Sequence, residues 1–211
     1  MERLHIYKQL NVIYPEKDIF YRLGGNTHLT KITDCARLHI SSAGRKAYSL
    51  CRPQGRWKLK AVKYVGENGV FFSDDMFLCG SRFAAMAENA SYIWFAAATV
   101  GEKVITERDL QQNVSDSVIY DAVAGEVADS TMDMVQKLAT AELARSGMVL
   151  DKSRYSPGYG DMPLEEQKAM FSILDMNDMN LKLTESCFIV PEKSVTAVAA
   201  VMMSNRKIDE L

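Results

Sequence analysis

The sequence predicts a single α+β domain over residues 1–211, with a largely antiparallel sheet and packed helices. Three observations support this fold class. A long amphipathic helical pattern runs from Ser115 to about Arg145, the continuous apolar run 91–101 is typical of a buried central strand, and the apolar segment 194–203 predicts a second strand. No internal repeat or obvious linker divides the chain, so one domain is the simplest organisation.

The composition is that of an ordinary globular protein with little net charge. Hydrophobic residues make up 47% of the chain and charged residues 25%, which is a normal balance for a domain that buries its own core. The net charge of −2 and the isoelectric point near 6.0 provide no general attraction to nucleic acid or to an anionic membrane. We therefore expect neither as a partner.

The amino terminus and the cysteines indicate a cytoplasmic protein. The first residues lack the apolar core of a signal peptide, and no apolar run reaches the ~18–20 residues that span a bilayer. The four cysteines are widely scattered without a CxxC pair, which fits reduced thiols and argues against a disulfide framework or a zinc site. Because the three histidines all lie in the first fifth of the chain, we expect no bound metal.

Local patterns predict the elements before the buried strand. A short helix is expected at 16–23, ended by the glycines of 24–26, which readily adopt a left-handed cap. Residues 35–66 carry a strand pattern, most clearly in "RWKLKAVKYV", where apolar and basic residues alternate. Apolar residues recur at roughly helical spacing over 76–86, so a helix is expected there.

A basic stretch lies between Cys35 and Gly66, where the sequence has no acidic residue. Two interpretations are open. The cations are either the solvated face of a sheet or a docking surface for an acidic partner or a phosphate-bearing cofactor. The basic residues are Arg37, Arg45, Lys46, Arg52, Arg56, Lys58, Lys60 and Lys63.

The strongest helical pattern in the chain begins near Ser115. Ser115 is suited to cap this helix, and Asp116 suits the positive end of its dipole. Over 30 residues or so the helix would span roughly 45 Å, and its methionines are best explained as core filler. One apolar stripe contains Ile119, Val123, Val127, Met134 and Leu138.

The C-terminal third predicts one helix and two strands. Pro163 is suited to the first turn of a helix, and acidic residues follow it. Segments 181–190 and 194–203 read as strands joined by 191–193, and the polar tail 204–211 is expected to fray.

The loop "SRYSPGYGD" (153–161) has more chemistry than a connecting turn needs. Arg154 offers a planar fork of donors for a carboxylate or phosphate. Pro157 stiffens the bend, two glycines permit close backbone approach, and two tyrosines bring flat rings. The loop therefore suits a small ligand with a carboxylate, an aromatic ring and a positive centre. The alternative is a structural turn with Arg154 in a surface ion pair.

The sequence that begins at this loop resembles a known family. "RYSPGYGDMPLEEQKAMFSILD" followed by "LTESCFIVPEKSVTAV" resembles the activation domain of cobalamin-dependent methionine synthase, which binds S-adenosylmethionine. The family's Arg-x-x-x-Gly-Tyr motif is matched by Arg154, Gly158 and Tyr159. "FAAATVGEKV" and "YDAVAGEVAD" are similar to stand-alone relatives, and "DIFYRLGG" is similar to their opening helix. The resemblance is densest over 94–199.

The resemblance implies a reactivation role on a partner protein. In this family, S-adenosylmethionine is presented to a corrinoid whose cobalt has oxidised to the inactive cob(II) form, while flavodoxin or another electron donor reduces it. The chain has no Asp-x-His-x-x-Gly cobalamin motif, so the cobalamin would be carried by a corrinoid methyltransferase such as methionine synthase. The domain itself would supply positioning and no catalytic residue.

The resemblance also implies roles for five residues. Arg154 would hold the methionine carboxylate, and Ser156 would offer its backbone to the ligand. Gly158 would permit close approach, and Tyr159 would lie between the ligand and the corrinoid. Asp121 aligns with an acidic residue near the corrin, with the alternative that it is a polar residue on the exposed side of the long helix.

Other functions compete with this one. The chain could instead be a non-catalytic module that completes a split methionine synthase or senses S-adenosylmethionine. A free-standing methyltransferase is disfavoured because no Gly-x-Gly loop follows a predicted strand. Two ligand-contacting features of the full-length domain have no counterpart here: an aspartate in an N-terminal segment and a tyrosine-bearing segment after the Ser-Val strand.

Overall fold

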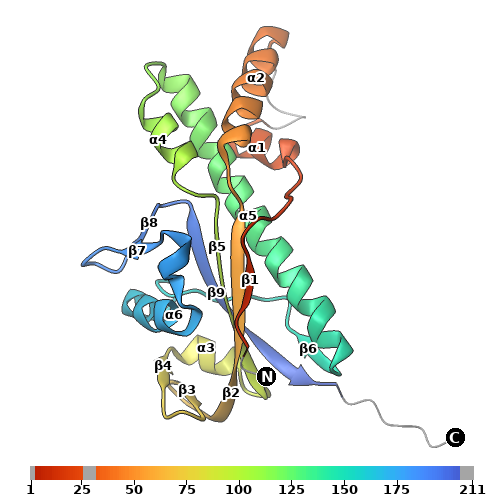
Figure 1. Ribbon diagram of the computed structural model, residues 1–211, viewed down its shortest axis with the longest axis vertical. Coiled ribbons are helices and arrows are strands. Elements are labelled where there is room, and N and C mark those ends of the chain that lie inside the picture. Colours follow the sequence, from red (N-terminus) through yellow and green to blue (C-terminus); the bar gives the residue numbers. More distant parts are fainter. Residues whose placement is uncertain (1–2, 26–31, 205–211) are drawn as a thin grey trace, which may run out of the picture.

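A computed structural model describes residues 3–25 and 32–204 of the chain (Figure 1). The helices are α1 (Glu16–Arg22), α2 (Asp34–Leu50), α3 (Ser81–Met86), α4 (Lys103–Asp109), α5 (Val114–Arg145) and α6 (Gln167–Leu174). Two 3-10 turns, Leu164–Glu166 and Met176–Met179, flank α6. The strands are β1 (His5–Tyr7), β2 (Gln54–Gly66), β3 (Gly69–Phe72), β4 (Phe77–Cys79), β5 (Tyr92–Thr99), β6 (Met148–Leu150), β7 (Lys182–Leu183), β8 (Ile189–Val190) and β9 (Ser194–Met203).

The sheet confirms the predicted α+β class and both principal strands. Seven strands pair in the order β4-β3-β2-β5-β9-β6, with β1 also paired to β2, and every pairing is antiparallel. β5 is the central strand, because all of it pairs with β2 on one side and β9 on the other. β7 and β8 form a separate hairpin.

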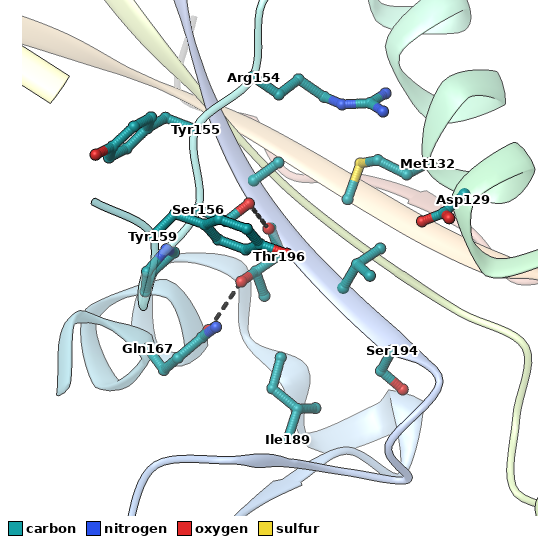
Figure 2. A pocket seen from close by; sticks show the side chains of 13 residues that line it. Asp129, Met132, Arg154, Tyr155, Ser156, Tyr159, Gln167, Ile189, Ser194 and Thr196 are labelled. Carbon is teal, nitrogen blue, oxygen red and sulfur yellow. Dashed lines mark hydrogen bonds between the residues drawn. The ribbon is translucent and has the colours of Figure 1, made fainter. Parts of the chain in front are cut away.

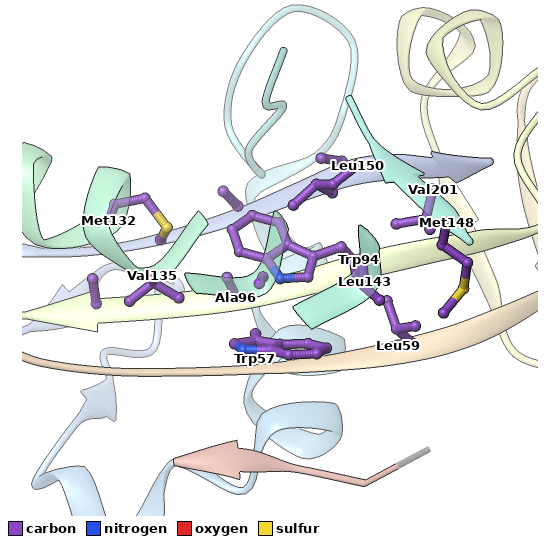
Figure 3. Packing of buried hydrophobic residues seen from close by; sticks show 14 of the residues in the cluster. Trp57, Leu59, Trp94, Ala96, Met132, Val135, Leu143, Met148, Leu150 and Val201 are labelled. Carbon is purple, nitrogen blue, oxygen red and sulfur yellow. The ribbon is translucent and has the colours of Figure 1, made fainter. Parts of the chain in front are cut away.

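The long helix α5 contributes to two cores. Its C-terminal half covers one face of the sheet, where Trp57 and Trp94 lie near Met132 and Val135 (Figure 3). Small residues of β5 such as Ala96 allow this close packing. The N-terminal half of α5 extends beyond the sheet and packs against α1, α2 and α4 (Figure 1).

The opposite face of the sheet is covered by α3 and α6 (Figure 1). Phe95 of β5 packs there with Phe72, Phe83 and Met170, all fully buried. The two faces explain why the apolar run of β5 shows no alternation, since side chains on both sides are buried.

A buried arginine joins the sheet to the end of α6. Arg56 of β2 is 1% exposed; its Nη1 donates to the carbonyl oxygens of Leu174, at 2.9 Å, and of Asp175, and its Nη2 donates to Asp178. The last carbonyls of a helix lack partners within the helix and carry partial negative charge. Arg56 therefore fixes the position of α6 on the sheet.

The helix α2 contradicts the first half of the strand predicted at 35–66. Thr33 caps the helix through its side-chain oxygen. The residues that α2 buries are small, Gly44 and Ala47, and a Cβ on Gly44 would lie 2.4 Å from the hydroxyl of Tyr14. The larger apolar residues of α2, such as Ile40 and Leu50, are only partly buried against this core. The second half of the prediction is correct, since β2 occupies it.

The basic stretch does not form one surface. Its first part lies on α2 and its second part on β2, where Arg56 is buried. Lys60 pairs with Asp74, and Lys63 pairs with Asp75 at 2.7 Å. Acidic residues from the following hairpin thus neutralise part of a segment that has none of its own.

Smaller predictions are corrected at element ends. Asn113 rather than Ser115 caps α5, with its side-chain oxygen accepting from the Ser115 N–H at 2.9 Å. The helix predicted at 76–86 divides into β4 and α3, and the strand predicted at 181–190 is the hairpin β7–β8. Of the tail expected to fray, residues 205–211 lie outside the described residues. Among the described helices, none has the length and apolar character of a membrane span.

Candidate functional site

The loop 153–161 forms one wall of a pocket at the edge of β9 (Figure 2). The pocket has a volume of about 470 Å³, which is in the range of small-molecule sites. Residues 194–197 of β9 form its back, α5 lines one side, and the first residue of α6 with part of the β7–β8 hairpin lines the other.

The loop is held along the edge of β9 by backbone contacts. Tyr155 and Val198 exchange two backbone hydrogen bonds of 2.9 and 2.8 Å, and Ser156 Oγ donates to the carbonyl oxygen of Thr196 at 2.8 Å. Alternate residues of a strand direct their backbone groups to the same side. Ser194 and Thr196 therefore direct theirs, like Val198, toward the pocket. This strand edge can hydrogen-bond a ligand.

Arg154 extends from the loop toward α5 (Figure 2). Its Nη1 donates to Asp133 at 2.7 Å and to the side-chain oxygen of Gln136 at 2.9 Å. Both contacts use one nitrogen of the fork, and within residues 3–25 and 32–204 neither Nε nor Nη2 has a partner. The surface ion pair expected as the alternative thus exists, yet donors of the guanidinium remain for a ligand on the pocket side.

Carboxylates of α5 add negative charge beside Arg154. Asp129 lines the pocket, and Arg22 of α1 approaches its Oδ2 at 3.3 Å. Partial burial raises the pKa of Asp129, and repulsion from Glu126 and Asp133 adds to the rise, against the attraction of Arg22 and Arg154. This part of the pocket therefore favours a ligand group that brings positive charge.

Asp161 anchors the far end of the loop to the start of α3. Its carboxylate accepts hydrogen bonds from the hydroxyl and backbone N–H of Ser81 and from the N–H of Arg82. The Ser81 hydroxyl and then these backbone donors lower the pKa of Asp161 to about 2. Gly158 lies in the turn between the anchors at φ 89°, a backbone conformation that residues with a side chain rarely adopt.

This anchor gives a pH-dependent prediction. The folded pKa of Asp161 is below its ordinary value of 3.8, so the anchor is complete above about pH 4 and is lost as the pH falls toward about 2. In a nuclear magnetic resonance titration, the amide signals of Ser81 and Arg82 should shift with a midpoint near pH 2. The shift should disappear in Asp161→Asn. A midpoint near 4 in the wild type would show that the carboxylate does not make these bonds.

The structure brings together some of the predicted site residues. Arg154, Ser156 and Tyr159 line the pocket, with Tyr159 69% exposed at its mouth. Gly158 belongs to the loop but does not line the pocket. Asp121 lies elsewhere, in a separate cavity of about 510 Å³.

Asp121 belongs to an ion-pair network that includes Lys193, the residue directly before β9. It accepts from Arg108 at 2.7 Å and from Lys193 at 2.9 Å. Burial opposes its ionisation, but the hydrogen bonds from Lys193 and Arg108 prevail and lower its pKa. Asp121 is thus not an isolated exposed residue of the long helix, and its place near a corrin stays a prediction.

Sequence reasoning missed the residues that α5, α6 and β9 contribute. Asp129 and Gln167 line the pocket but carry no motif of their own. The start of β9 does carry a signal, because Ser194 and Thr196 interrupt an otherwise apolar strand with hydroxyl groups on one face.

Comparisons with known proteins find matches among solved structures, but not among family models or curated proteins. No family model matches the sequence, and no curated protein matches it. Among solved structures, the chain is similar to a crystal structure of the MetH reactivation domain bound to AdoHcy, with a TM-score of 0.60 and 15% sequence identity. The similarity covers 92% of this chain and 79% of that one. The chain therefore has the fold of the MetH reactivation domain.

Proposed function

We propose that the chain binds S-adenosylmethionine in the pocket at the β9 edge and serves as a reactivation domain for a partner corrinoid methyltransferase. The observation that supports this proposal is that the family motif and the pocket lie at the same place in the structure. The Arg-x-x-x-Gly-Tyr motif of Arg154, Gly158 and Tyr159 lies in the loop that forms the pocket wall. The fold is that of a domain whose crystal structure contains AdoHcy, the demethylated form of this ligand.

The donor set of the pocket fits the charges of S-adenosylmethionine. The remaining donors of Arg154 suit the carboxylate of the methionine end, by a charge-assisted contact. Asp129, on the same side of the pocket, suits the ammonium and sulfonium centres of that end. The open backbone edge at Ser194 and Thr196 offers further hydrogen bonds. A volume of about 470 Å³ accommodates a ligand of this size.

The chain's residues would act by positioning. Bound S-adenosylmethionine supplies the methyl group that the reduced cobalt of a partner's cobalamin accepts. Arg154 would fix the methionine end, while the exposed ring of Tyr159 at the pocket mouth would face the incoming corrinoid. Asp161 would keep the loop in place on α3. Holding the two reactants together in this way raises their effective concentration.

Reconstitution tests this function. A cobalamin-dependent methyltransferase that lacks this domain is converted to the cob(II) form and given S-adenosylmethionine with flavodoxin or a chemical reductant. We expect absorbance to return to that of methylcobalamin only when the chain is added, and not with Arg154→Ala. If the chain binds S-adenosylmethionine but does not restore methylcobalamin, the proposal is wrong and a sensing role is favoured.

A further inference from the structure

Buried polar side chains gather at the α6 side of the pocket. Only six polar or charged residues are buried in the described part of the chain. Three of them, Gln167, Ser194 and Thr196, line this pocket, and a fourth, Thr99, accepts a 2.8 Å hydrogen bond from the Ser194 hydroxyl. Burial of polar groups is unfavourable unless they are paired. Here Thr196 is paired with Gln167 and Ser194 with Thr99, so this wall of the pocket is polar and can hydrogen-bond a ligand.

Gln167 is the member of this group whose side chain still has hydrogen-bond donors available for a ligand. It begins α6, is 5% exposed, and accepts at Oε1 from the Thr196 hydroxyl at 2.8 Å. Ser156 of the loop binds the carbonyl of the same Thr196. With its oxygen engaged, the Gln167 side chain retains its two N–H donors, and Nε2 has no partner within the described residues. Gln167 therefore presents a donor, held in orientation by Thr196, to the pocket.

The two sides of the β9 edge fit different ends of a ligand. Arg154 and Asp129 lie on the α5 side, whereas Gln167 and its partner Thr196 lie on the α6 side (Figure 2). A ligand whose charged methionine end is held on the α5 side must direct its other end across the edge of β9. For S-adenosylmethionine that other end is the adenine nucleoside, whose ring nitrogens are hydrogen-bond acceptors.

We propose that Gln167 is the specificity-determining residue for the adenine base and donates from Nε2 to a ring nitrogen. This assignment rests on the proposed function, because it requires a nucleoside ligand in the pocket. It gives Thr196 a positioning role, since its hydroxyl donates to Gln167 Oε1 and leaves Nε2 for the ligand. A loss of the Gln167 donor should cost about tenfold in affinity, the value typical of one buried hydrogen bond.

Binding of base-modified ligands tests the assignment. The probes are AdoHcy and its 1-deaza, 3-deaza and 7-deaza analogues, each of which replaces one ring nitrogen with a C–H group. Calorimetry of the wild type should show one analogue about tenfold weaker than AdoHcy. In Gln167→Leu, AdoHcy itself should bind about tenfold more weakly, and that same analogue should lose nothing further. Gln167→Glu, which keeps the acceptor for Thr196 but lacks the donor, should show the same losses of affinity as Gln167→Leu. Thr196→Val should weaken the binding of AdoHcy by less than tenfold.

The outcomes separate the two proposals. If the wild type binds AdoHcy but each deaza penalty persists unchanged in both Gln167 variants, Gln167 has only a structural role and the assignment is overturned. The same conclusion follows if all four ligands weaken by one common factor. If the wild type binds none of the ligands, the proposed function itself fails, and the assignment fails with it. Circular dichroism confirms that each variant is folded.

Discussion

Arg154→Ala is expected to weaken the binding of S-adenosylmethionine by about 30-fold or more while the protein remains folded. A carboxylate held by a guanidinium in a partly enclosed site makes a charge-assisted contact, and loss of one partner typically costs ~2–5 kcal/mol. The fold should tolerate the change, because the present partner Asp133 is 68% exposed and can be hydrated. An exposed ion pair of this kind contributes only about 0–1 kcal/mol.

Two further variants make this result specific. Arg154→Lys should restore affinity only in part, since an ammonium group cannot reproduce the planar fork. Lys152→Ala removes a cation two residues away, on an exposed side chain, and should bind like the wild type. Calorimetric titrations of the four proteins give the comparison. Equal affinities of wild type and Arg154→Ala would show that Arg154 belongs only to its ion pair with Asp133.

Arg56→Ala is expected to lower the free energy of unfolding by about 3 kcal/mol or more, the scale of a buried ionic contact that loses one partner. The reason is the set of acceptors left behind. The carbonyl oxygens of Leu174 and Asp175 at the end of α6 lose their donor, and the space around a side chain that is 1% exposed is left empty. Asp178 is 53% exposed and can turn to water.

Matched variants separate the charge from the packing of Arg56. Arg56→Met keeps much of the volume without the donors, and should be less damaging than Arg56→Ala. Lys58→Ala, on the same strand but only partly buried, should change stability little. Urea denaturation followed by circular dichroism measures the series. A loss below about 1 kcal/mol for Arg56→Ala would mean that α6 does not depend on this contact, since that is the scale of an ordinary exposed ion pair.

The parts of the fold that the sequence predicts well are those with long, uniform patterns. β5, β9 and α5 have apolar residues buried over their whole length or along one continuous stripe. α2 is not evident from the sequence because it is held through small residues such as Gly44, whose close contact with Tyr14 is a property of the tertiary structure. A single sequence gives no sign of such contacts.

The residues of the site likewise divide into those that a sequence motif identifies and those that only the tertiary structure brings to the pocket. Arg154, Ser156 and Tyr159 lie within one short motif, so a motif could point to them. Asp129 and Gln167 reach the pocket only because α5 and α6 pack on opposite faces of the sheet beside β9. The pairing of Arg154 with Asp133 is likewise a contact between segments 21 residues apart. Asp121 lines a separate cavity and pairs with Arg108 and Lys193, and its place near a corrin stays a prediction.

The most direct test of a ligand site at the β9 edge is amide hydrogen exchange of the wild-type protein with and without saturating AdoHcy. Slower exchange is predicted in residues 154–159 of the loop and 194–197 of β9, where backbone groups border the pocket. A third cavity, of about 600 Å³ between α1 and α2, provides the internal comparison, and exchange at its lining residues should not change. Protection confined to that cavity, or no protection at any described residue, would contradict the assignment of the site.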